Sequence, residues 1–240
     1  MNYAPRPLKL LLFDIDGTLM LSYGGGLRAM TEAACRVFCP GFSLATIDFN
    51  GRLDPEIVVE ALATNGVEAT HAQLEAFRQH YFRRLPSELS SARALPGVLD
   101  LLARLRKTEG VVLGLVTGNY TDSARLKLRA VGIDPDWFVI HGCGEVAETR
   151  PALVRWAMDA ASDLAGRAVR PADTIVLGDT PRDVDCAKAN GCLAVAVATG
   201  QFSVDILRCT AADLVLSDFR DPAVLLEMLD WPRPSASGVI

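Results

Sequence analysis

The chain has 240 residues, of which 50% are hydrophobic and 22% are charged, a balance typical of a globular protein with a sizeable core. Its net charge of −5 at pH 7 argues against a protein that binds nucleic acids or membrane surfaces through general electrostatic attraction. No apolar stretch approaches the roughly 20 residues of a membrane span, and no signal peptide is recognisable, so a cytoplasmic location is expected.

Six short apolar runs are predicted to be buried strands. The first, Leu8–Phe13, is too short for a helix and leads into a turn-forming Asp-Gly pair. The others are Val111–Val116, Trp137–Ile140, Thr174–Leu177, Leu193–Val197 and Leu214–Leu216. Helical patterns separate the strands, for example an apolar face from Val98 to Leu105 and a helix from about Pro151 to Leu164. Such alternation predicts an α/β fold with a doubly wound, Rossmann-like parallel sheet.

One segment, residues 21–91, breaks this alternation because it contains only helical patterns: Leu27–Phe38, Pro55–Asn65 and Thr70–Leu85. A run of three glycines near its start and Pro/Ser-rich composition near its end are typical of hinges. Since a simple crossover needs far fewer residues, we expect an α-helical cap domain at 21–91, inserted into a core made of 1–20 and 92–240. The tail at 231–240 is expected to be frayed.

Polar residues follow three of the predicted strands. The segment Asp14–Leu19 follows the first strand, Thr117–Asn119 the second and Gly178–Asp183 the fourth. Because ligands bind beyond the carboxyl ends of the strands in such a sheet, these residues should meet at one edge. The carboxylates among them would repel one another unless a cation lies between them. Oxygen-only ligands favour Mg²⁺, which pairs naturally with phosphate oxygens, so the expected substrate is phosphorylated.

These segments carry a resemblance to a known family. The ordered motifs are Asp14-x-Asp16-Gly17-Thr18-Leu19, Thr117-Gly118-Asn119 and Gly178-Asp179-x-x-x-Asp183. They resemble those of the haloacid dehalogenase superfamily, in its phosphoglycolate-phosphatase-like branch with a helical cap, and the similarity covers nearly the whole chain. The resemblance implies a Mg²⁺-dependent phosphatase that acts on a small phosphorylated metabolite through an aspartyl-phosphate.

The resemblance also implies roles for the matching residues. Asp14 would be the nucleophile, and Asp16 the general acid that protonates the leaving oxygen and then the base that activates water. Asp14, Asp179 and the backbone carbonyl of Asp16 would hold Mg²⁺. Thr117 would hydrogen-bond the transferring phosphoryl group, and Asn119 would position the substrate or the nucleophile. The neighbouring turn residues expected to contact the substrate are Gly17, Thr18 and Gly118.

Asp183 has two compatible interpretations. Thr180 is a candidate N-cap followed by Pro181, which puts Asp183 at the capping-box position of the next helix. The start of that helix faces the expected site, so Asp183 is also a candidate metal ligand.

At the third motif the chain departs from the family pattern. Family members carry a lysine there, whereas this chain has Arg150 before Pro151. Arg150 is expected to supply the missing charge through its guanidinium fork, with Arg155 as the weaker candidate and a solvated helix-start residue as the alternative interpretation. In the cap, Arg52 is expected to grip the end of the substrate that is not transferred.

Two rival functions remain open, a sugar phosphomutase on the same scaffold and a catalytically silent binding module. A phosphonate-cleaving relative would need a cap lysine, and residues 21–91 contain none. The sequence does not name the substrate, and it leaves a monomer or a homodimer equally acceptable.

Overall fold

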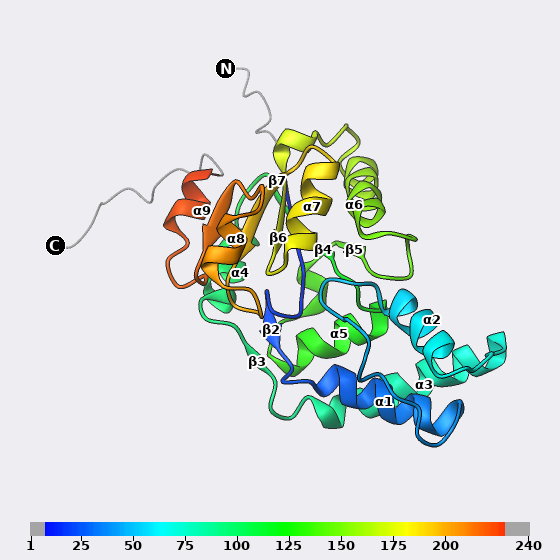
Figure 1. Cartoon of the computed structure of the whole chain (residues 1–240). Helices are drawn as coiled ribbons and strands as arrows, with labels where there is room; N and C mark the ends of the chain where they lie inside the picture. The colour runs from blue at the N-terminus through cyan, green and yellow to red at the C-terminus, as the bar shows by residue number, and fades with distance from the viewer. Residues whose placement is uncertain (1–7, 229–240) are drawn as a thin grey trace, which may run out of the picture.

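The computed structural model describes residues 8–228, and the tail expected at 231–240 lies outside the described residues (Figure 1). Within them, six parallel strands form one sheet in the order β5-β4-β1-β6-β7-β8. The strands are β1 (Lys9–Phe13), β4 (Val111–Val116), β5 (Ile140–Gly142), β6 (Thr174–Gly178), β7 (Leu193–Val197) and β8 (Leu214–Leu216). The predicted Rossmann-like α/β sheet is therefore confirmed.

Helices cover both faces of the sheet, as the alternation along β1 requires. Leu11 and Phe13 of β1 belong to one apolar cluster, which includes residues of α4, α5 and α9, while Leu10 and Leu12 belong to a second cluster with α6 and α7. The described helices are α1 (Gly25–Val37), α2 (Asp54–Thr64), α3 (His71–Glu88), α4 (Val98–Leu105), α5 (Thr121–Ala130), α6 (Arg150–Ala165), α7 (Pro181–Ala189), α8 (Val204–Arg208) and α9 (Ala223–Met228). None of them is long and apolar enough to cross a membrane.

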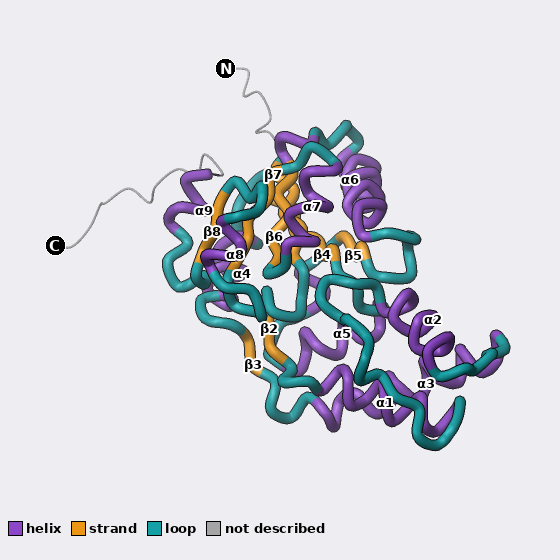
Figure 2. The backbone as a smooth tube through the Cα atoms, viewed as in Figure 1, coloured by secondary structure: helices purple, strands orange, loops and turns teal. Residues whose placement is uncertain are grey.

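The helical segment between the first two sheet strands contains α1, α2 and α3, as predicted. A two-stranded antiparallel ribbon that the sequence did not reveal joins its two ends: β2 (Met20–Leu21) pairs with β3 (Arg93–Ala94). α1 packs against α3, and α3 also contacts α5 of the core. The connection between α1 and α2 is a long loop that runs back toward the sheet (Figure 2).

The third strand lies later in the chain than predicted. The sequence pattern gave Trp137–Ile140 as a strand, but Pro135–Trp137 form a 3-10 turn and β5 begins only at Ile140. Asp134 caps the turn by accepting a hydrogen bond from the backbone N–H of Asp136, and Pro135 supplies the fixed backbone angle that suits its first position. Local turn chemistry therefore overrides the apolar character of Trp137.

Candidate active site

The three predicted motifs meet because their strands are neighbours. β1 lies between β4 and β6, so Asp14, Thr117 and Asp179 each follow directly on adjacent strands at the same edge of the sheet. The backbone of Asp14 donates to the carbonyl of Leu177 at 2.9 Å, which extends the β1–β6 ladder into the site. All three side chains are buried.

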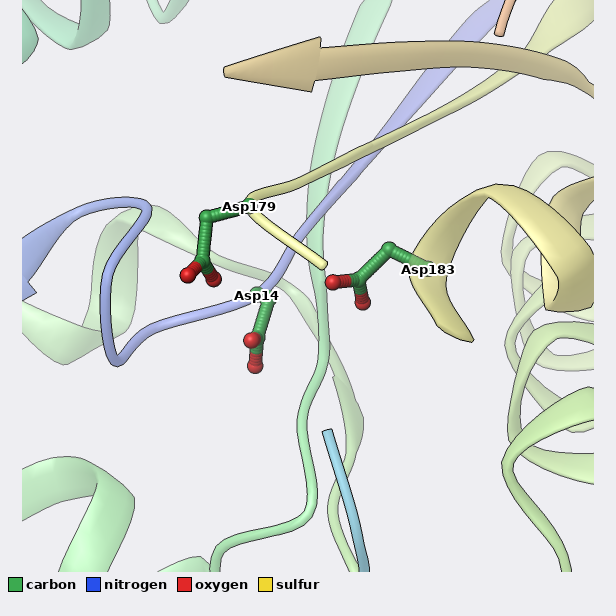
Figure 3. A group of neighbouring side chains, drawn as sticks. All are labelled: Asp14, Asp179 and Asp183. Carbon is green, nitrogen blue, oxygen red and sulfur yellow. The ribbon is translucent and has the colours of Figure 1, made fainter. Parts of the chain in front are cut away.

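Asp14, Asp179 and Asp183 form a compact acidic cluster. Each offers a carboxylate oxygen within 4.8 Å of the others, and Figure 3 shows the three neighbouring side chains. Burial, together with the negative charges of Asp183 and Asp14, raises the pKa of Asp179 to about 9. Burial also raises the pKa of Asp14 to about 6, although the nearby Arg150 charge opposes the shift. Unless a cation is bound, the surroundings of the cluster therefore disfavour the ionised forms of Asp14 and Asp179.

The surroundings of Asp179 leave room for its carboxylate only because two glycines face it. A β-carbon at Gly17, whose φ is +80°, would lie 2.3 Å from Asp179 Oδ2, and one at Gly200 would lie 1.7 Å from the same atom. Thr18 is fully buried, and its hydroxyl donates to Asp179 Oδ1 at 3.4 Å. The donor set is made of oxygens alone and fits a hard divalent cation.

Arg150 is the positive charge beside this cluster. Its Nη2 lies 3.2 Å from Asp14 Oδ2 and 2.5 Å from Asp183 Oδ1, and its Nε donates to the same Asp183 oxygen at 3.1 Å. The alternative interpretation of Arg150 as a solvated residue is wrong, since the residue is only 7% exposed. Arg150 is nevertheless the first residue of α6, after the N-cap Thr149, and Arg155 lies exposed on the same helix.

Asp183 has the capping role expected from the sequence. Thr180 is the N-cap of α7, its side chain accepts from the Asp183 backbone at 3.3 Å, and Asp183 Oδ2 accepts from the Thr180 backbone at 3.0 Å. The other carboxylate oxygen, Oδ1, accepts from Arg150. One side chain thus fixes the start of the helix and takes part in the acidic cluster.

Asp16, Asn119 and Lys127 form a second polar group beside the first. Asn119 Nδ2 donates to Asp16 Oδ2 and to Thr117 Oγ1, each at 2.8 Å. Lys127, from α5, donates to Asp16 Oδ2 at 2.6 Å and to Asn119 Oδ1 at 2.5 Å. Sequence reasoning assigned no role to Lys127. Lys127 lies with Ser123 on the buried face of α5, but their spacing of four residues does not by itself indicate a functional residue.

Both polar groups border a cavity of about 290 Å³ beneath the helical segment. Its lining includes Asp14, Asp16, Arg52, Asp54, Tyr81, Thr117, Gly118, Asn119, Lys127, Arg150 and Asp179. Two residues expected to contact the substrate, Gly17 and Thr18, are not part of this lining; they lie against Asp179 instead.

The loop that leads into α2, together with Asp54 at the start of that helix, forms the roof of the cavity and is held to the core. Asp54 donates its backbone N–H to the carbonyl of Gly118 at 2.7 Å, and its carboxylate accepts from the Tyr120 backbone at 3.0 Å. Arg182 of α7 donates to the Asn50 carbonyl and pairs with Asp48 at 3.0 Å. The contacts hold residues 48–54 over the strand ends.

Arg52, which the sequence analysis expected to grip the substrate, lies in this roof and lines the cavity. Its guanidinium pairs with Glu60 and lies 3.9 Å from Glu56, both on α2. An anion that binds Arg52 would therefore have to compete with these two carboxylates.

The site brings together a buried carboxylate, a second carboxylate open to the cavity, a hydroxyl, an amide and two cations. Such a set can perform nucleophilic attack, proton transfer and stabilisation of an anionic group in one enclosed space.

Comparisons with known proteins agree with this chemistry. The sequence model of the haloacid dehalogenase-like hydrolase family matches residues 11–197. The phosphoglycolate phosphatase of Rhodospirillum rubrum is 31% identical over 94% of this chain and 92% of its own length. A probable phosphatase of Dickeya dadantii, IndB, is 27% identical over 88% of this chain and 90% of its own.

Solved structures resemble the fold over the same extent. CbbY from Rhodobacter sphaeroides, in complex with phosphate, superposes with a TM-score of 0.70 at 19% identity, covering 90% of this chain and 96% of its own. A predicted phosphoglycolate phosphatase from Haemophilus somnus gives a TM-score of 0.65 at 23% identity, covering 91% and 97%. With most of its length matched by the family model, the chain belongs to the haloacid dehalogenase-like hydrolases.

Proposed function

We propose that the protein is a Mg²⁺-dependent phosphatase that hydrolyses a small phosphorylated metabolite through an aspartyl-phosphate on Asp14. The observation that carries the proposal is the position of the Asp14 carboxylate. It lies on the cavity floor within the acidic cluster, 3.2 Å from Arg150, and Asp16 and Thr117 line the same cavity. A nucleophile, a proton carrier and a phosphate-binding hydroxyl thus face one space.

The first half-reaction transfers the phosphoryl group to the protein. An Asp14 carboxylate oxygen attacks phosphorus, the bond between phosphorus and the ester oxygen breaks, and Asp16 gives its proton to the departing oxygen. Thr117 is placed to donate its hydroxyl to a phosphoryl oxygen, because the Asn119 amide donates to that same hydroxyl and leaves its proton free. Arg150 stabilises negative charge at Asp14.

The second half-reaction releases the group to water. Asp16, now ionised, takes a proton from a water molecule that attacks phosphorus, and Asp14 departs as a carboxylate. Asp14, Asp179, the Asp16 carbonyl and Asp183 are the residues that would hold Mg²⁺, either directly or through water. A bound Mg²⁺ would neutralise the carboxylates and polarise the phosphoryl group. The roof at 48–54 keeps bulk water from the ester during transfer.

The relatives and the size of the cavity support a small substrate. The Rhodospirillum rubrum relative is a phosphoglycolate phosphatase, and about 290 Å³ is at the lower end of ordinary ligand pockets, before any contribution from opening of the roof. We therefore infer a compact phosphate ester such as phosphoglycolate or a short sugar phosphate. Arg52, which lines the cavity, favours an anionic or hydroxyl-bearing leaving group.

A phosphate-release assay tests the proposal. The purified protein should liberate inorganic phosphate from p-nitrophenyl phosphate and from a panel of small phosphate esters when Mg²⁺ is present, and chelation should stop it. The Asp14→Asn variant, which removes the nucleophile, should lose at least about 1,000-fold in kcat/KM. If the wild type is inactive across the whole panel, a catalytically silent binding module is favoured. Return of the phosphoryl group to a sugar would identify a phosphomutase.

A further inference from the structure

Lys127 is buried although it carries a charge. The residue is 5% exposed, on the inner face of α5, where it lines the cavity. A lysine held away from water needs oxygen partners, and here they are Asp16 Oδ2 and Asn119 Oδ1. The backbone of α1 passes close above it, since a β-carbon at Gly26 would lie 3.4 Å from the ammonium nitrogen. The ammonium group is therefore held in one place.

The two oxygens of the Asp16 carboxylate have different surroundings. Oδ2 accepts from Lys127 at 2.6 Å and from Asn119 at 2.8 Å, which occupies both of its lone pairs. Oδ1 has no hydrogen-bond partner among residues 8–228. The Asp16 side chain is 40% exposed and lines the cavity. A proton on Asp16 therefore has its place on Oδ1.

Asn119 connects this arrangement to the phosphate-binding side. Its amide nitrogen donates to both Asp16 and Thr117, while its amide oxygen accepts from Lys127. The acceptance from Lys127 fixes which end of the amide faces Asp16. Lys127 thus orients Asp16 directly and also through Asn119.

We propose that Lys127 is a positioning residue for proton transfer, which fixes the Asp16 carboxyl so that Oδ1 alone exchanges the proton with the leaving oxygen and then with water. This inference rests on the proposed phosphatase function. In the step itself, the proton on Oδ1 moves to the ester oxygen as the bond to phosphorus breaks, and the bonding electron pair stays on that oxygen. The ammonium of Lys127 keeps all of its protons.

Leaving-group dependence tests the role. An alkyl phosphate such as phosphoglycolate needs a proton on its leaving oxygen, whereas p-nitrophenolate leaves readily without one. The Lys127→Met variant keeps the length of the side chain and removes its charge. We expect its kcat/KM to fall about 100-fold for the alkyl phosphate and less than about 5-fold for p-nitrophenyl phosphate. Lys127→Arg should restore part of the lost alkyl activity.

Two controls separate positioning from loss of structure. Lys188 of α7 pairs with Asp213 away from the cavity, so Lys188→Met should leave both activities unchanged. In an Asp16→Asn background, Lys127→Met should change the ratio between the two substrates no further, because the residue acts through Asp16. Should Lys127→Met fail to fold, the ratio of kcat/KM for the alkyl phosphate to kcat/KM for p-nitrophenyl phosphate can be measured with Lys127→Gln and Lys127→Arg.

The outcomes distinguish this inference from the function on which it rests. Suppose that the wild type is active and that Lys127→Met lowers kcat/KM equally for both substrates, or for neither. Either result overturns the role of Lys127 and leaves the phosphatase function intact. The role of Lys127 is also overturned if Lys127→Met changes the ratio of the two activities further in the Asp16→Asn background. A wild type that releases no phosphate from either ester overturns the proposed function itself.

Discussion

The floor of the cavity and its roof are built in different ways. The floor residues Asp14, Thr117 and Asp179 each follow directly on a strand of the sheet. The position of each is therefore fixed by the few residues of the strand before it. The roof depends on contacts between distant parts of the chain, such as those of Asp54 with Gly118 and Tyr120. We infer that the floor supplies the chemistry and that the roof supplies enclosure and selection.

Removal of the charge beside the nucleophile should have the largest effect. Arg150→Ala leaves Asp14 and Asp183 without their cationic partner, so we expect kcat/KM to fall about 1,000-fold and the metal-free protein to lose about 3–5 kcal/mol of stability. Arg150→Lys keeps the charge and should retain more activity. Steady-state kinetics and urea unfolding measure the two effects.

Arg155→Ala is the matched control, because Arg155 lies exposed on the same helix. It should leave both quantities nearly unchanged. If Arg150→Ala turned over substrate as fast as the wild type, the floor would not depend on this charge.

A substitution where roof and floor touch should have an intermediate effect. A β-carbon at Gly118 would lie 1.8 Å from the carbonyl oxygen of Arg52, so Gly118→Ala prevents the roof from lying as close as it does. We expect kcat/KM to fall about 10- to 100-fold, because small misplacements of groups in an enclosed site have effects of this size. The melting temperature should change by only a few degrees, since the sheet is untouched. Unchanged kcat/KM would mean that closure is unimportant for turnover.

The smallest effect concerns stability rather than activity. Burial raises the pKa of Asp54 from 3.8 to about 6, although the charge of Lys127 opposes the shift. Between these two values the unfolded chain has lost the proton that the folded chain still holds, so stability falls as the pH rises from 4 to 6 and stays lower above it. Asp54→Asn cannot ionise and should escape this loss, gaining up to about 3 kcal/mol on the wild type between pH 4 and pH 7.

Urea unfolding at the two pH values measures the effect of Asp54→Asn. The asparagine oxygen can still accept from the Tyr120 backbone, so the contact with the core is kept. Asp159→Asn, at an exposed position on α6, keeps Asp54 and should therefore lose stability between pH 4 and pH 7 as the wild type does. Parallel behaviour of Asp54→Asn and the wild type would contradict the buried, protonated state of Asp54.

The strands of the sheet could be predicted from the sequence because buried parallel strands have continuous apolar runs. Val111–Val116, Leu193–Val197 and Leu214–Leu216 have the predicted bounds. The ribbon of β2 and β3 was missed because each strand has only two residues, too few for any periodicity. β5 was misplaced because a 3-10 turn occupies the residues before it.

The floor of the site was predictable for a similar reason, since strand-end motifs are local in sequence. Lys127 could not be found in this way. Its contact with Asp16 spans 111 residues and depends on how α5 lies against the end of β1, which no local pattern encodes. The burial of Arg150 depends likewise on α6 packing beside α7.

Detection of the phosphorylated nucleophile is the most direct test of the account. The Asp16→Asn variant should hydrolyse the intermediate slowly, so a reaction with p-nitrophenyl phosphate can be quenched in acid while the phosphoryl group is still attached. Borohydride then reduces an aspartyl-phosphate to homoserine, which peptide mass spectrometry locates. Reduction is expected at Asp14, and none is expected when Asp14→Asn is added. Reduction at another carboxylate, or none in a variant that still releases p-nitrophenolate, would contradict it.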